Sequence, residues 1–128
     1  MLQGSWTKGG RGREVPIRTA AQRDVLERAT VLAAGGALIP PTRRYREQRQ
    51  VYEYETARVG LTRMHGLRHA YAQERYQELT GWAAPVAGGP TRAQLTPAQR
   101  VRDLDARLRL SAELGHGREE ITTAYLGR

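Results

Sequence analysis

Three histidines and a tyrosine close to the C-terminus are the residues whose types and spacing suggest chemistry. Two of the three histidines, His65 and His69, flank Arg68 in the stretch LTRMHGLRHAYAQ. The third, His116, lies in LSAELGHGREEITTAYLGR, nine residues before Tyr125. A tyrosine hydroxyl can act as a nucleophile, and an imidazole can transfer a proton near neutral pH. Tyr125 is therefore a candidate nucleophile, and the alternative is an ordinary core aromatic residue on a short terminal helix.

The spacing of His65 and Arg68 suggests an anion site. The two residues are three apart, so on a helix their side chains lie on the same side. Arginine donates two parallel hydrogen bonds to a phosphate or carboxylate, and imidazole adds a further donor. Together they suit a phosphodiester. The alternative is an arginine paired with a neighbouring glutamate and a histidine that caps the helix.

The same histidines also suggest a competing hypothesis, a zinc site. His65 and His69 would share one helix face, and His116 would be the third ligand. However, Gly66 stands where a zinc protease motif needs its glutamate base. Arg68 also places a fixed positive charge between the two ligands, which disfavours a second cation. We therefore assign no metal ligand.

Composition points to a polyanionic partner. The chain has 128 residues, a net charge of +8 and a pI of about 10.7, and Lys8 is the only lysine among 21 basic residues. Such a chain attracts nucleic acid. It has no cysteine, which excludes disulfides and thiolate metal sites. The longest apolar run, VLAAGGALI, is too short to cross a bilayer, and the first residues lack the apolar core of a signal peptide. We expect a cytoplasmic protein without membrane contact.

These candidate residues need a scaffold, and the sequence predicts a mainly α (α+β) domain over residues 1–128. The stretch QGSWTKGGRGREVPIR predicts a β-hairpin over residues 2–17, with Lys8 at its glycine-rich tip. About five helices follow over residues 19–126, and the hairpin is expected to pack on them. Residues from about 80 to 96 have no periodicity and are predicted to form an inserted loop.

Capping residues and apolar periodicity locate the helices. Thr19 and Gln22 form a capping-box pattern, and Thr96-Pro97 is a typical helix start. Thr42 is expected to cap the second helix. The third helix is predicted over about 64–79 and the last over about 118–126. The residues expected to be buried in the first and fourth helices are Val25, Leu26, Ala29, Leu32, Ala33, Val101, Leu104, Leu108 and Ala112.

Three motifs in this order resemble the tyrosine recombinase (phage integrase) family. HGLRHAYA and LGHGREEITTAYL are similar to that family's histidine, two residues and arginine, then Leu-Gly-His, then a tyrosine nine residues on. TKGGRGREVPI resembles the family's β-hairpin, whose tip carries a catalytic lysine. The resemblance runs from Lys8 to Tyr125. It implies the C-terminal part of a recombinase catalytic domain, which acts in site-specific DNA recombination and integration.

The resemblance implies a role for each of five residues. Tyr125 would attack the scissile phosphate and form a 3′-phosphotyrosyl link to DNA. Arg68 would stabilise the charge of the transition state. His65 would assist proton transfer, and His116 would hold the phosphate by a hydrogen bond. Lys8 would protonate the departing 5′ oxygen, which arginine does poorly because it hardly releases its proton. The alternative for Lys8 is a solvated tip residue.

The resemblance also sets limits. His69 matches a supporting position, so it stays outside the catalytic set. The family's first catalytic arginine has no match before Lys8, and we therefore expect weak catalysis from this chain alone. The alternative function is a catalytically silent DNA-binding fragment. The expected partners are double-stranded DNA and further copies of the chain on that DNA, and the expected cofactors are none, because one phosphoester is exchanged for another.

Overall fold

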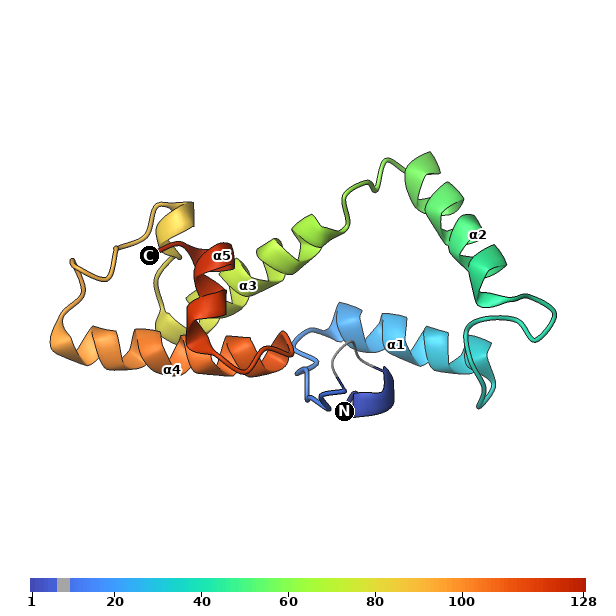
Figure 1. The fold of residues 1–128 in the computed structure, drawn as a ribbon, viewed down its shortest axis with the longest axis horizontal. Helices are drawn as coiled ribbons and strands as arrows, with labels where there is room; N and C mark the ends of the chain where they lie inside the picture. Colours follow the sequence, from blue (N-terminus) through green and yellow to red (C-terminus); the bar gives the residue numbers. More distant parts are fainter. Residues whose placement is uncertain (7–9) are drawn as a thin grey trace. The chain divides into compact units, whose positions relative to one another are not determined.

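The computed structural model describes residues 1–6 and 10–128. Its helices are shown in Figure 1. They are η1 (Gly4–Trp6), α1 (Ala20–Ala33), α2 (Tyr45–Arg58), α3 (His65–Thr80), η2 (Pro85–Ala87), α4 (Pro97–Glu113), η3 (Glu119–Thr122) and α5 (Thr123–Leu126). The chain divides into two compact units, one made of Met1–Val15 with His65–Arg128 and the other of Pro16–Met64. The units are described separately.

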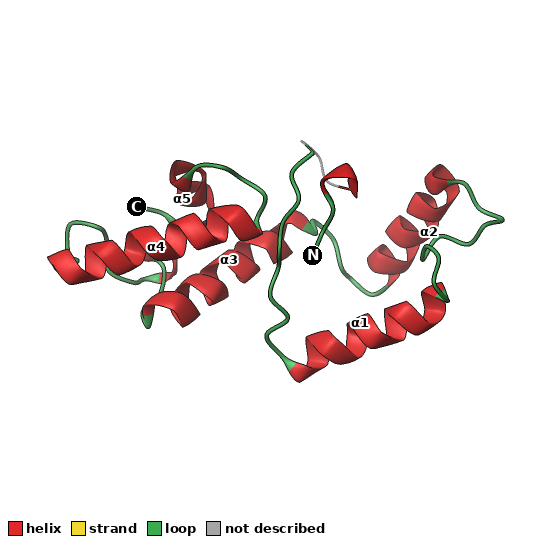
Figure 2. Ribbon diagram, turned by 90° about the horizontal axis from the view of Figure 1, so that it is seen from below, coloured by secondary structure: helices red, strands yellow, loops and turns green. Residues whose placement is uncertain are grey.

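The β-hairpin predicted over residues 2–17 is wrong. The described part of the chain contains helices and no strand, as the colours of Figure 2 show. Only Leu2 and Arg13 pair, through two backbone hydrogen bonds of 2.7 and 3.0 Å in an isolated antiparallel bridge. The pairing goes no further because the backbone winds into η1 directly after it. The glycines of this segment also favour strands poorly, and a two-stranded hairpin is at best marginally stable.

The unit that contains both termini has a core built from α3, α4 and α5. These helices lie side by side in both views (Figures 1 and 2). The core residues are Ala72, Tyr76, Ala84, Ala106, Leu110, Leu114, Tyr125 and Leu126. The loop from Gly81 to Thr96 covers one part of this core through Ala84 and Trp82. The capping box at Thr96 is confirmed, with Pro97 in the first turn of α4.

A buried polar network ties the end of the chain to α4. Nε of Arg107 donates to Oδ1 of Asp103 at 2.9 Å, and both side chains are 6% exposed. The hydroxyl of Tyr76 donates to the same carboxylate oxygen at 2.6 Å. Arg107 also donates to the carbonyl oxygen of Gly127 at 3.1 Å and, over 3.5 Å, to the hydroxyl of Thr122. It therefore holds both flanks of α5.

The prediction of which face of α4 is buried is wrong, and this network explains why. Val101, Leu104 and Leu108 are 71%, 44% and 51% exposed. The helix instead buries the face that carries Asp103 and Arg107. Apolar periodicity cannot find such a face because its central residues are charged.

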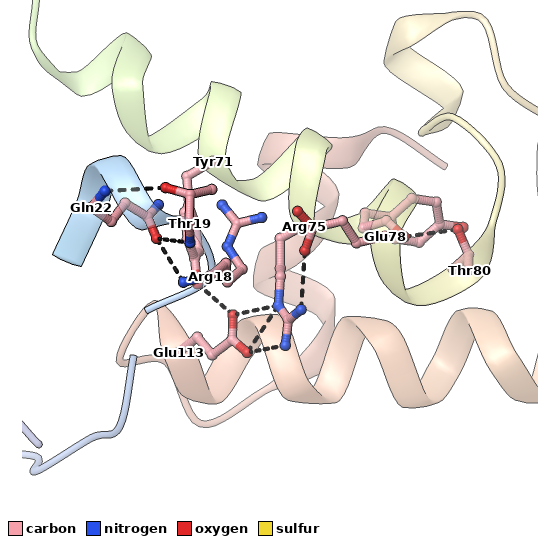
Figure 3. A network of polar contacts seen from close by, with 9 residues as sticks. Arg18, Thr19, Gln22, Tyr71, Arg75, Glu78, Thr80 and Glu113 are labelled. Atoms are coloured by element: carbon pink, nitrogen blue, oxygen red, sulfur yellow. Dashed lines mark hydrogen bonds and ion pairs between the residues drawn. The ribbon is translucent and has the colours of Figure 1, made fainter. Parts of the chain in front are cut away.

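The other unit consists of α1 and α2 with their connections, and neither helix has a buried residue. The capping box of Thr19 and Gln22 is confirmed, and it is drawn in Figure 3. No residue of the apolar stripe expected on α1 is buried, and its three largest side chains, Val25, Leu26 and Leu32, are 54%, 49% and 80% exposed. Two helices of 14 residues each supply too little apolar surface to form a core of their own. The predicted cap of the second helix, Thr42, is replaced by Arg44.

None of the helices in residues 1–6 and 10–128 combines the length and the apolar character needed to cross a membrane.

Candidate functional site

The first turns of α3 and the short helix α5 bring together residues that are far apart in sequence. Arg68 lies in the first turns of α3, and Tyr125 lies in α5. Nε of Arg68 donates a hydrogen bond of 3.0 Å to the hydroxyl oxygen of Tyr125. The guanidinium carbon also lies 5.8 Å from the centre of the tyrosine ring. Tyr125 itself is 7% exposed. Its backbone is held by Gln73 of α3, whose side-chain amide donates to the Tyr125 carbonyl oxygen at 3.2 Å.

His116 completes a triangle with these two side chains. Its Nε2 lies 3.1 Å from Nη2 of Arg68 and 3.3 Å from the hydroxyl oxygen of Tyr125. Nη2 of Arg68 also donates to the carbonyl oxygen of Leu114, two residues before His116. Because a guanidinium is only a donor, Nε2 of His116 acts as an acceptor here and the ring proton sits on Nδ1. The triangle thus joins a cation, a neutral imidazole and a phenol.

The surroundings of His116 favour this neutral form. Burial lowers its pKa, and the positive charges of Arg68, Arg13 and Arg11 lower it further. A neutral imidazole is the form that accepts a proton, and Nε2 can take one once its lone pair is released from Arg68. The acceptor nitrogen faces the tyrosine hydroxyl, which is the arrangement required of a general base.

The other two histidines lie beside this triangle. The ring of His69 is 4.9 Å from the ring of Tyr125, at an angle of 59°. The ring of His65 packs edge-on against His69 at 5.6 Å, and His65 is exposed. Among the described residues, no hydrogen bond, ion pair or ring contact joins His65 to Arg68, His116 or Tyr125. The structure therefore places His69 closer to the candidate nucleophile than His65.

The turn that carries His116 is anchored to α3 through Glu113 (Figure 3). The hydroxyl of Tyr71 donates to this carboxylate at 2.6 Å, and Nη2 of Arg75 donates to it at 3.1 Å. Arg75 bridges to Glu78 as well, at 3.1 Å. Glu113 is the last residue of α4, so these bonds fix the place where the chain leaves the helix.

Four residues of this region were not singled out by the sequence analysis. They are Gln73, Glu113, Arg11 and Arg13. Gln73 follows His69 by four residues, so the helical period alone could have indicated it. Arg11 and Arg13 carry no spacing signal, because their approach to His116 depends on chain segments about a hundred residues apart.

Two hypotheses from the sequence are not represented among these contacts: Lys8 as the general acid, and a zinc site. Lys8, the expected general acid, lies outside the described residues. In residues 1–6 and 10–128, no three histidine, cysteine, aspartate or glutamate side chains gather closely enough to hold a metal ion. His65, His69 and His116 therefore do not form the ligand set that the zinc hypothesis requires.

The comparisons with known proteins give one family match. The sequence model of a family described as Integrase matches residues 4–74, which is more than half of the chain. The matched segment contains His65, Arg68 and His69 and ends before His116 and Tyr125. No curated protein and no solved structure matches the chain.

Proposed function

Because this chain belongs to the integrase family, whose members act in DNA integration and recombination, we propose that it cleaves a DNA strand by attack of Tyr125 on a phosphodiester. The product would be a 3′-phosphotyrosyl link, as the resemblance to the tyrosine recombinases implies. The same attack in reverse, by a 5′-hydroxyl, would rejoin the strand. Residues 1–128 would then be part of a recombinase catalytic domain.

The contact that carries this proposal is the triangle of Tyr125, Arg68 and His116. A nucleophile, a base and a stabilising cation lie within 3.3 Å of one another in pairs. This is the relation expected of a nucleophile activated by a neighbouring base. The three residues come from separate segments of the chain. A single hydrogen bond between two of them would be enough to hold α5 in place. Their meeting therefore favours the hypothesis that Tyr125 is a nucleophile over the alternative that it is an ordinary core aromatic residue.

The proposed reaction balances without an external cofactor. The Tyr125 oxygen forms a bond to phosphorus while the bond between phosphorus and the 5′ oxygen breaks. The proton of the hydroxyl passes to Nε2 of His116, and the 5′ oxygen takes a proton from Lys8. Arg68 stabilises the negative charge on the phosphate oxygens. One phosphoester replaces another, so the reaction needs no nucleotide to drive it.

The geometry supports roles for the histidines that differ from those the resemblance implies. His116 faces the hydroxyl of Tyr125 at 3.3 Å, whereas His65 is exposed and contacts His69. We therefore assign the base to His116 and leave His65 to contact the DNA backbone. The ring of His69 orients the tyrosine. Assembly of several copies on DNA stays a prediction.

A nicked duplex of random sequence tests the proposal without a known target. Cleavage next to the nick releases a short strand that diffuses away, so a covalent complex accumulates. The chain should form a complex that resists detergent, and Tyr125→Phe should abolish it. The matched control is Tyr54→Phe, because Tyr54 is 64% exposed and belongs to the other unit. Undiminished adduct in Tyr125→Phe would exclude Tyr125 as the nucleophile.

One observation favours a second candidate, DNA binding without cleavage. Tyr125 is 7% exposed and belongs to the hydrophobic core, which also suits a purely structural aromatic residue. A silent binder would hold DNA through its arginines and form no adduct at any incubation time. Retention of duplex DNA by both wild type and Tyr125→Phe, with no covalent product from either, identifies this case.

A further inference from the structure

Two more arginines lie against the turn that carries His116. Nη1 of Arg13 donates a long hydrogen bond, 3.5 Å, to the carbonyl oxygen of Leu114. The same oxygen accepts a hydrogen bond from Nη2 of Arg68. Two guanidinium groups therefore converge on one carbonyl oxygen, two residues before His116 along the chain.

The glycines on either side of His116 make room for arginine side chains. A Cβ atom added to Gly115 would collide with Nη1 of Arg13, and one added to Gly117 would collide with Nη1 of Arg11. Gly115 also has a φ of +77°, which other residues rarely adopt. The turn is thus enclosed by guanidinium groups at close range.

In the described part of the chain, no carboxylate pairs with Arg13 or with Arg68. Nε of Arg13 is buried and has no hydrogen-bond partner there. Glu113, the acidic residue next to Leu114 in sequence, is occupied by Tyr71 and Arg75.

Such a cluster is a site for an anion. Like charges that gather around one turn repel each other, and a negative group bound between them offsets this repulsion. The field they create is visible in His116, whose pKa falls because of burial and then because of Arg68, Arg13 and Arg11. A phosphate has enough acceptor oxygens to serve several guanidinium groups at once, and the planar fork of arginine matches them in pairs.

We propose that Arg11 and Arg13 bind, together with Arg68, the phosphate that Tyr125 attacks. The identity of that phosphate as a DNA phosphodiester rests on the proposed function, whereas the cluster itself is a feature of the turn around His116. Arg13 shares an acceptor with Arg68, so it lies within reach of the same phosphate. Arg11 extends the cluster past Gly117.

Inorganic phosphate serves as the probe. The chain is titrated with phosphate while NMR follows the ring of His116 and the Nε–H groups of the arginines. Arg13→Gln should raise the phosphate Kd measured at His116 about tenfold, because a charged hydrogen-bond donor is lost. Gly117→Ala should also weaken binding, because its methyl group displaces Arg11 while the net charge stays the same. Arg92→Gln is the matched control, since Arg92 is exposed in the same unit and loses the same charge. Its Kd should stay within about twofold of wild type.

Three results would overturn the inference. The first is an unchanged Kd in both Arg13→Gln and Gly117→Ala. The second is an equal loss in Arg92→Gln, which would mean that net charge alone attracts phosphate. The third is a titration in which neither His116 nor Arg13 responds. If Arg13→Gln and Gly117→Ala both bind phosphate normally while Arg68→Gln does not, this inference fails and the proposed function stands. Failure of the proposed function would be seen in a different experiment, as a covalent adduct that still forms with Tyr125→Phe.

Discussion

Arg68 and Tyr125 are joined by a hydrogen bond of 3.0 Å, from Nε to the hydroxyl oxygen, although 57 residues separate them in sequence. The arginine that would bind the phosphate is thus already in contact with the group that would attack it. The contact also ties α3 to α5 and so contributes to the fold. An incoming phosphate has to share Arg68 with the tyrosine and with the carbonyl oxygen of Leu114.

The first prediction concerns the directional bonds of Arg68. Arg68→Lys keeps the charge but cannot reach Tyr125, His116 and Leu114 together, because lysine is a point charge on a flexible stem. We expect the free energy of unfolding to fall by about 1–3 kcal/mol, as a part-buried acceptor loses its donor. Urea denaturation measures the change. An unchanged midpoint together with normal adduct formation would show that the triangle is dispensable.

The second prediction concerns pH. The pKa of His116 is lowered in the folded chain, so the unfolded chain takes up the proton first as pH falls. The stability that neutral His116 provides is complete above its ordinary pKa of about 6.5 and decreases as pH falls below that value. Wild type should therefore lose stability relative to His116→Gln over this acid range. Adduct formation should decline in the same range if His116 is the base. Parallel pH profiles for the two proteins would contradict the assignment.

A third prediction compares two Asp–Arg pairs with the same spacing on α4. Arg107→Met leaves Asp103 buried without its cation, and we expect a loss of about 3–5 kcal/mol. Arg109→Met removes an arginine that is 59% exposed and pairs with Asp105, and we expect a change below about 1 kcal/mol. Denaturant unfolding of both variants gives the comparison. Equal effects would mean that Arg107 does not anchor α5.

The fourth prediction concerns Lys8 and derives from the resemblance alone. Lys8→Arg should slow cleavage of an ordinary phosphodiester while DNA affinity changes little, because arginine keeps both its charge and its proton. A substrate with a p-nitrophenolate leaving group needs no protonation, so the variant should cleave it at the wild-type rate. A wild-type rate on ordinary DNA would remove Lys8 from the mechanism.

Local signals predicted part of this molecule well. The helix starts at Thr19 and Thr96-Pro97 depend on side chains three residues away, and both capping boxes are present. The hairpin over residues 2–17 was wrong because alternating residues and a glycine-rich tip do not ensure a second strand pair beyond Leu2 and Arg13. Burial on α4 was also predicted wrongly, because the buried face contains an ion pair.

At the candidate site, too, the sequence predicted what depends on local spacing and missed what depends on long-range packing. The motif spacing singled out Arg68, His116 and Tyr125, and the structure brings these three together. It does not bring His65 to them. An offset of three residues places two side chains on the same side of a helix, but the packing of α5 decides which of them it contacts. The approach of Arg13 to the His116 turn is a contact over 101 residues, for which one sequence holds no periodic signal.

The most direct test of the central claim is to identify the atom that becomes attached to DNA. The covalent complex formed on nicked duplexes is digested with protease and nuclease, and the linked peptide is sequenced by mass spectrometry. We predict a nucleotide joined through its 3′-phosphate to the Tyr125 oxygen. A nucleotide on another residue, or one joined through its 5′-phosphate, would contradict the account.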